Sequence, residues 1–90
     1  LQTLEKEALE AMINSHEVRG QVTEALRYAE RLERLEPLSE STYRHLMRLH
    51  YLSGDKAAAL AAYKRCVTLL KEELRTEPLA ETQTLAREIE

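Results

Sequence analysis

The sequence lacks tryptophan and phenylalanine and contains a single cysteine, Cys66. One cysteine excludes a disulfide within the chain and is typical of a reducing compartment, so we expect a cytoplasmic protein. Two glycines and two prolines in 90 residues leave little room for β-sheet or for long loops. No apolar run approaches the ~18 residues that cross a bilayer, so we expect no membrane segment.

The chain also lacks an excess of positive charge. Its formal net charge is −3 and its pI is about 5.7, whereas surfaces that bind nucleic acid are usually basic. We therefore expect no direct contact with nucleic acid. Hydrophobic residues make up 43% and charged residues 32%, which is typical of a folded domain rather than a disordered segment. Ninety residues suffice for one small domain, and we predict a single domain over residues 1–90.

What the sequence does contain is an internal repeat with a period of 34 residues, which separates Gly20 from Gly54. Other pairs recur at the same offset: His16 and His50, Ala25 and Ala59, Leu26 and Leu60, Arg31 and Arg65, Leu35 and Leu69. A helix–Gly turn–helix unit of this length is the spacing of the tetratricopeptide repeat. Such helix pairs stack, because one pair cannot bury its apolar face alone. We predict an all-α fold: a tetratricopeptide-like, right-handed stack of antiparallel helix pairs with about five helices.

Turn and capping residues divide the chain. Gly20 ends a first helix over residues 3–16, because glycine takes a left-handed turn without steric cost. Pro37 stops the second helix, Ser39 is the expected N-cap of the third, and Asp55 that of the fourth. The fourth helix is expected to extend to about residue 74, because the next proline comes late. The predicted repeats are 3–37 and 38–77, with a partial third repeat over 78–90.

Small residues mark the expected helix crossings. Ala25 and Ala59 follow the two glycines at the same distance, and a large side chain there would push the paired helices apart. Cys66 falls where the repeat requires a small buried residue. Nothing near it in the sequence would lower the pKa of its thiol, so we interpret it as a structural residue and not a nucleophile.

The sequence offers no recognisable catalytic or metal-binding motif. His16 and His50 occupy equivalent repeat positions, but the HxxxH and CxxC spacings of metal sites are absent. We interpret both histidines as packing or helix-end residues. Phosphate-binding loops and nucleophile motifs are also absent. We therefore expect no metal, no cofactor and no enzymatic activity.

The most informative polar residues lie on the predicted inner helices, which line the concave face of such a stack. Arg44 and Arg48 are four residues apart and share a helix face, and Tyr51 follows one turn later. Arginine and tyrosine are enriched at protein-recognition hot spots. We predict a protein-binding groove formed by Glu10, Asn14, Arg44, Arg48 and Tyr51, bordered by Glu7, Glu17, Ser41 and Leu52. Alternatively, Arg44 and Arg48 form ion pairs with Glu7 and Glu10 of the neighbouring inner helix, and both interpretations can hold together.

Four phrases between Leu35 and Ile89 point to a particular family. They are Glu36 to Met47 (EPLSESTYRHLM), Ser53-Gly54-Asp55, Ala59 to Tyr63 (ALAAY), and Leu70 to Leu74 (LKEEL) followed by Glu77-Pro78. Their order and spacing resemble the bacterial transcriptional activator domain of antibiotic-regulatory-protein type regulators. Arg75 departs from the pattern, which has Gly there, and this leaves the cap of the fourth helix open.

The resemblance implies a non-catalytic, regulatory protein-interaction domain of a bacterial transcription regulator. Because the helical pattern already begins at Leu1 without a methionine, we interpret the chain as a piece of a larger regulator, whose DNA-binding domain lies outside it. The expected partner is a protein: a neighbouring domain, a second subunit in a homodimer, or the transcription machinery. The alternative is a general tetratricopeptide adaptor that binds a peptide or a partner helix in its concave groove.

Overall fold

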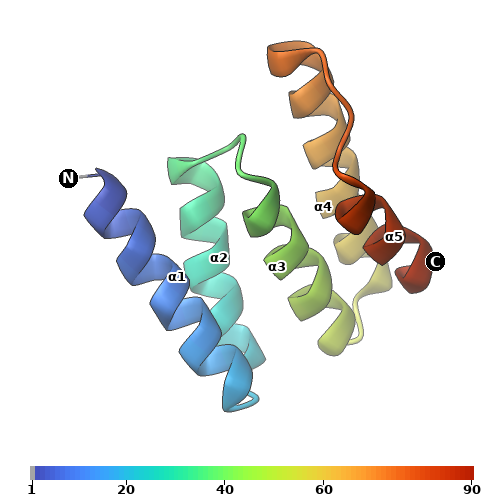
Figure 1. Cartoon of the computed structure of the whole chain (residues 1–90). Helices are drawn as coiled ribbons and strands as arrows, with labels where there is room; N and C mark the ends of the chain where they lie inside the picture. Colours follow the sequence, from blue (N-terminus) through green and yellow to red (C-terminus); the bar gives the residue numbers. More distant parts are fainter. Residues whose placement is uncertain (1) are drawn as a thin grey trace.

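The computed structural model describes residues 2–90, with side chains described from Leu4 onward, so Leu1 of the predicted domain lies outside the described residues. The helices are α1 (Gln2–Val18), α2 (Val22–Leu35), α3 (Glu40–Leu52), α4 (Lys56–Leu69) and α5 (Ala80–Ile89), and a short π-helix, η1 (Leu70–Leu74), continues α4. Figure 1 shows α1–α2 and α3–α4 as antiparallel pairs arranged side by side, with α5 beside α3 and α4. The predicted all-α stack of helix pairs is confirmed. No helix in the described part of the chain is long and apolar enough to cross a membrane.

The two glycine turns have the geometry that their residue type requires. Gly20 and Gly54 have φ angles of +74° and +86°, in the left-handed region where a Cβ atom is strained. A Cβ added at either position would meet no atom within 4 Å. Glycine is therefore needed at both turns for its backbone conformation and not for lack of space.

The two predicted N-caps differ in outcome. The Asp55 side chain accepts a hydrogen bond from the Ala58 N–H at 2.9 Å, so the predicted cap of α4 is confirmed. Ser39 is the N-cap residue of α3, but its hydroxyl makes no capping bond and instead lies 3.2 Å from the hydroxyl of Ser41. Its carbonyl oxygen accepts from the Thr42 N–H. The predicted position was right, but the side chain does not perform the capping role.

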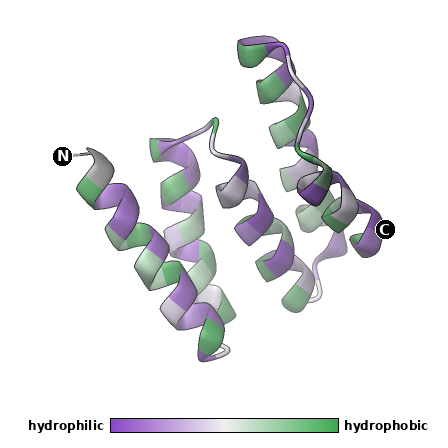
Figure 2. Ribbon diagram, viewed as in Figure 1, coloured by the Kyte–Doolittle hydropathy of each residue, from purple (hydrophilic) through white to green (hydrophobic). Residues whose placement is uncertain are grey.

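The core is centred on α3, which lies between the first helix pair and α4–α5. Its buried residues cover most of its circumference: Thr42, Tyr43, His45, Leu46, Met47 and Leu49. Ala25 and Ala59 are fully buried, as their predicted crossing role requires. The Tyr43 hydroxyl donates to the Pro37 carbonyl at 2.7 Å, and burial, followed by the nearby Glu33 carboxylate, raises the pKa of Tyr43 to about 12. Figure 2 shows that apolar segments recur along the length of α1, which is at the edge of the stack.

The fourth helix extends beyond its counterpart α2, as predicted, because η1 adds a turn after Leu69. Arg75 then takes the left-handed conformation, with φ 53° and ψ 43°. Its N–H donates to the Lys71 carbonyl at 3.1 Å, and the Thr76 N–H donates to the Leu70 carbonyl at 3.3 Å. The helix therefore ends with the left-handed cap that a glycine would favour, although arginine occupies the position. The chain then returns along α4 and begins α5.

Candidate protein-interaction surface

The structure separates the five predicted groove residues into two groups. Glu10 and Asn14 lie on α1, while Arg48 and Tyr51 lie on α3, which packs beside the first helix pair. We call these four residues, together with Glu17, the α1–α3 face. Asn14 is exposed, Tyr51 is 52% exposed, and Glu10 is half-buried. Arg44, the fifth predicted residue, faces α5 instead, as its contacts below show.

Arg48 is held by one residue from each inner helix. Its Nε lies 3.4 Å from a carboxylate oxygen of Glu17 on α1, and its Nη2 lies 3.0 Å from Nδ1 of His45 on α3. A guanidinium can only donate hydrogen bonds, so Nδ1 of His45 must accept and the imidazole is neutral. The other oxygen of Glu17 lies 3.6 Å from the same nitrogen. This cluster joins α1 to α3.

The electrostatics of His45 agree with a neutral ring. Burial lowers its pKa below the ordinary value of 6.5, and the Arg48 charge acts in the same direction, while the carboxylates of Glu17 and Glu10 oppose the shift. The sequence interpretation did not assign His45 a role. The sequence did contain a signal for the contact between His45 and Arg48. The two residues are three apart on one helix, and residues at this spacing are neighbours on a helix surface.

Arg44 connects α3 to α5. Its Nη1 donates to the Thr82 hydroxyl at 2.7 Å, and its guanidinium lies 3.5 Å from Glu81 and 3.8 Å from Glu40. Only 16% of the side chain is exposed. The alternative prediction of ion pairs was therefore right in kind but wrong in its partners. Arg44 pairs with Glu40 and Glu81, and Arg48 pairs with Glu17, in place of Glu7 and Glu10.

Glu40 connects two copies of a Glu-Pro-Leu phrase, which occupy residues 36–41 (EPLSES) and 77–82 (EPLAET). It belongs to the first phrase, and its carboxylate accepts from the Leu79 N–H at 2.9 Å and from the Thr82 hydroxyl at 2.7 Å, both in the second phrase. Leu79 is the N-cap residue of α5. A carboxylate at this place satisfies an N–H group near the helix start and interacts favourably with the helix dipole. The first phrase thus anchors the helix that the second phrase begins.

The remaining singled-out side chains have packing roles. The His16 ring stacks on Tyr28, with centroids 5.5 Å apart and planes 10° apart, and its Nδ1 lies 2.6 Å from the Gln21 side-chain oxygen. Cys66 is fully buried, as predicted. Burial, with a smaller effect from Glu40 and against Arg44, raises the pKa of its thiol to about 11, which disfavours the reactive thiolate. The described residues contain no group of three or more His, Cys, Asp or Glu side chains able to hold a metal ion.

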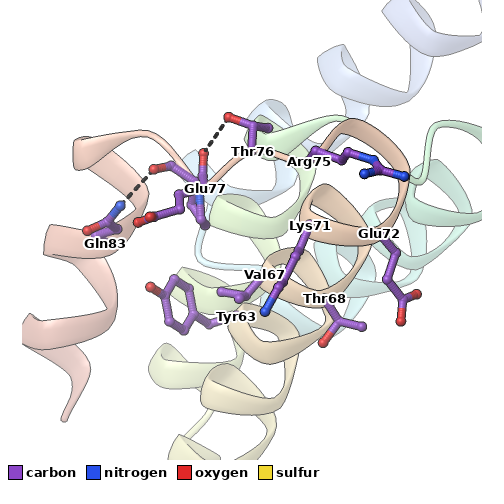
Figure 3. Close-up of a pocket in the computed structure, with 10 residues that line it drawn as sticks. Tyr63, Val67, Thr68, Lys71, Glu72, Arg75, Thr76, Glu77 and Gln83 are labelled. Atoms are coloured by element: carbon purple, nitrogen blue, oxygen red, sulfur yellow. Dashed lines mark hydrogen bonds between the residues drawn. The ribbon is translucent and has the colours of Figure 1, made fainter.

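An open cleft of about 1350 Å³ lies between the end of α4, the segment 75–78 and α5. In Figure 3, Gln83 projects from α5 toward α4, on which Tyr63 lies nearest to it. Glu72 and Arg75 point away from α5. The Gln83 amide donates to the Pro78 carbonyl at 2.8 Å. The sequence did not predict this cleft. The cleft forms only because α4 and η1 extend beyond the start of α5, and that arrangement depends on the tertiary structure. Its lining mixes both signs of charge with apolar residues, and it contains no focused cluster of catalytic groups.

Comparison with known proteins agrees with the fold and with the sequence phrases. A family model described as the bacterial transcriptional activator domain matches residues 1–90. The comparisons with curated proteins and with solved structures found no match. The family match covers both helix pairs, α5 and the two Glu-Pro-Leu phrases that the Glu40 contacts connect. The chain therefore belongs to the bacterial transcriptional activator domain family.

Proposed function

We propose that this activator domain works as a non-catalytic protein-interaction module, which transmits contacts with other proteins to a DNA-binding domain. The observation that best supports the proposal is Tyr51, an aromatic residue that is 52% exposed on the inner helix α3. It lies one turn after Arg48, so the two side chains share a helix face. Exposed tyrosine beside arginine is the composition of protein-recognition hot spots.

The contacts of Arg48 favour recognition by a preformed surface. Glu17 and His45 hold its guanidinium from two directions, so little side-chain freedom remains to be lost when a partner binds. Because Glu17 also balances its charge, we expect the partner to contact Tyr51 and the plane of the guanidinium through apolar or aromatic groups. The partner is a neighbouring domain, a second subunit or the transcription machinery.

Two further observations support a role without catalysis or direct DNA contact. The fully buried cysteine has a raised pKa, which disfavours nucleophilic chemistry. The arginines of the inner helices are paired with carboxylates of Glu17, Glu40 and Glu81, so they do not form a free basic patch for phosphate groups. We propose that DNA binding belongs to another domain of the regulator.

Tyr51→Ala in the full-length regulator tests the proposal, because this exposed side chain can be removed without opening the core. We expect transcription of a reporter under the regulator's control, and capture of its protein partner, to fall at least ~tenfold, as for a hot-spot residue. The control is Arg34→Ala, an exposed residue on the outer helix α2. Circular dichroism should give both variants the wild-type melting temperature. Full reporter activity in the Tyr51 variant would contradict the proposal.

A further inference from the structure

His45 is a buried titratable residue at the contact between two inner helices. Only 8% of the residue is exposed. Its Nδ1 atom lies 3.0 Å from Nη2 of Arg48 on α3 and 3.6 Å from a carboxylate oxygen of Glu17 on α1. The equivalent residue of the first repeat, 34 positions earlier, is Ala11. The second repeat therefore has a proton-binding group where the first repeat has none.

One nitrogen atom of this ring faces two neighbours of opposite charge. In the neutral ring Nδ1 accepts a hydrogen bond from Arg48, and the ring proton is then on Nε2. The carboxylate of Glu17 cannot bond to Nδ1 in this state, because a carboxylate and an unprotonated nitrogen are both acceptors. Their separation of 3.6 Å is too long for a hydrogen bond, in agreement with this assignment. The structure therefore shows the arrangement of the neutral ring.

A proton bound at Nδ1 reverses these roles. Both ring nitrogens then donate, so the Nδ1–H group and the guanidinium of Arg48 face each other as two donors of like charge. The carboxylate oxygen of Glu17 at 3.6 Å is already in place as an acceptor. A movement of under ~1 Å would bring it to the ~2.8 Å of a charge-assisted hydrogen bond. Protonation thus changes the partner of Nδ1 from Arg48 to Glu17.

Arg48 has little else to keep it in place. Its other polar contact within residues 4–90 joins Nε to the second carboxylate oxygen of Glu17 at 3.4 Å, which is longer than most N–H···O hydrogen bonds. The Arg48 side chain is 40% exposed, so the guanidinium can move into solvent when His45 stops accepting and Glu17 turns toward the charged ring. Tyr51 lies one turn later on the same helix face. The movement of Arg48 therefore changes the surroundings of this exposed tyrosine.

From this geometry we propose that His45 is a pH-dependent switch of the α1–α3 face: the neutral ring holds Arg48, and the protonated ring binds Glu17 and releases Arg48. The face then has two states, a preformed one near neutral pH and a loosened one in acid. A weaker affinity for a partner in the loosened state rests on the proposed function, in which the partner contacts Arg48 and Tyr51. The release of Arg48 itself does not depend on that function.

The surroundings of the ring determine the pH at which the switch operates. Burial and then the Arg48 charge lower the pKa of His45 below the ordinary value of 6.5, while the carboxylates of Glu17 and Glu10 oppose the shift. These charged groups lie on α1 and on α3 itself, and α2, α4 and α5 contribute none among the side chains described. We therefore expect the change of state below pH ~6.5.

Nuclear magnetic resonance on the ¹⁵N-labelled chain tests the switch without a partner. Between pH ~7 and ~5, the Nδ1 resonance of His45 should report the uptake of the proton. The order parameter of the Arg48 Nε–H bond should fall with the same midpoint to below ~0.6, the range of flexible groups. Arg34, an exposed arginine on α2, is the control and should not change with this midpoint. The backbone amide signals should show that the chain stays folded throughout.

Two variants separate the roles of the ring and of the carboxylate. In His45→Gln, position 45 can still accept from Arg48 but does not titrate, so Arg48 should stay ordered down to pH ~5. His50→Gln, at the half-buried histidine of the same helix, is the matched control and should keep the transition of the wild type. Glu17→Gln removes the carboxylate that favours the charged ring, so the midpoint of the His45 transition should move to lower pH.

Four results would overturn the proposal. They are an Arg48 that stays ordered while His45 takes up its proton, an equal loss of order in His45→Gln, an unchanged midpoint in Glu17→Gln, and unfolding of the chain in step with protonation. The first and third decide the question even where His45→Gln does not fold. Tyr51→Ala should leave the Arg48 transition unchanged, so the switch and the proposed function can fail separately.

Discussion

The inner helices α1 and α3 occupy equivalent positions of the same repeat but have different surroundings. In α1 only Leu9 and Ile13 are buried among the described side chains, whereas α3 buries six residues around most of its circumference. Both helices have apolar residues at the equivalent positions that face their own outer helix. Most of the difference arises on the opposite side, where α3 meets the preceding helix pair and no described helix covers α1, and part of it arises at Met12, which is more exposed than its counterpart Leu46. A repeat position therefore determines which residues form the helix, and the place in the stack determines how many of them are buried.

The largest expected effect comes from the pair Leu46 and Met12, which are equivalent residues of α3 and α1. Leu46 is fully buried, while Met12 is 39% exposed. Leu46→Ala should lower the free energy of unfolding by ~2–5 kcal/mol, because it removes buried methyl groups and leaves a cavity. Met12→Ala should cost clearly less, since solvent already reaches this side chain. Urea denaturation measures both, and equal losses would show that the two helices are buried alike.

A smaller effect is expected from His45, whose counterpart in α1 is Ala11. Because the folded state lowers the pKa of His45 below 6.5, the folded protein binds this proton more weakly than the unfolded chain. Neutral His45 therefore contributes to the free energy of unfolding in full above pH ~6.5, and this contribution is lost as the pH falls below that value. Glu10 and Glu17 on α1 and Arg48 on α3 are the charged groups that affect it. We therefore expect the free energy of unfolding to decrease as the pH is lowered from ~6.5 toward ~5.

His45→Gln separates this effect from general acid destabilisation. Glutamine can still accept from Arg48 but does not titrate, so the unfolding free energy of this variant should depend less on pH between ~5 and ~7. His50→Gln, at the half-buried histidine five residues later, is the matched control. If both variants keep the pH dependence of the wild type, the contacts of His45 do not control it.

The smallest expected effects concern the left-handed residues at the helix ends. Gly54→Ala should destabilise the fold by ~1 kcal/mol, because φ is +86° there and no neighbour compensates for the strain. Arg75→Gly should stabilise it by ~0.5 kcal/mol, since relief of the strain at φ 53° exceeds the added freedom of the unfolded chain. Shifts of a few degrees in melting temperature report both changes. A loss of stability in the Arg75 variant would mean that its side chain makes a stabilising contact.

Much of the fold was predictable from local patterns. The helix pairs, the two glycine turns, the Asp55 cap and the extended fourth helix follow from signals that lie within a few residues of each feature. The burial of Ala25, Ala59 and Cys66 follows from the repeat period. Ser39 shows the limit of such rules, because its residue type suits an N-cap but its hydroxyl bonds to Ser41.

The candidate interaction surface was predictable only in part. Helical spacing was sufficient to place Tyr51 and Arg48 on one face of α3, with Glu10 and Asn14 on α1. It could not distinguish Arg44 from Arg48, although the first is held at α5 and the second at α1. Both arginines have the same spacing and chemistry, and their difference lies in which distant carboxylate reaches them.

The sequence by itself determined the helices, their turns and the family, because periodic burial and backbone strain act over one or two turns of chain. The tertiary structure decided which helices enclose α3 and how the polar residues pair. Glu17 meets Arg48 across 31 residues, and Glu40 meets Thr82 across 42. Neither separation equals the 34-residue repeat period. Which side chains of neighbouring helices face one another depends on the angles at which the helices pack and on the added turn η1. Only the folded stack brings these partners within hydrogen-bonding distance.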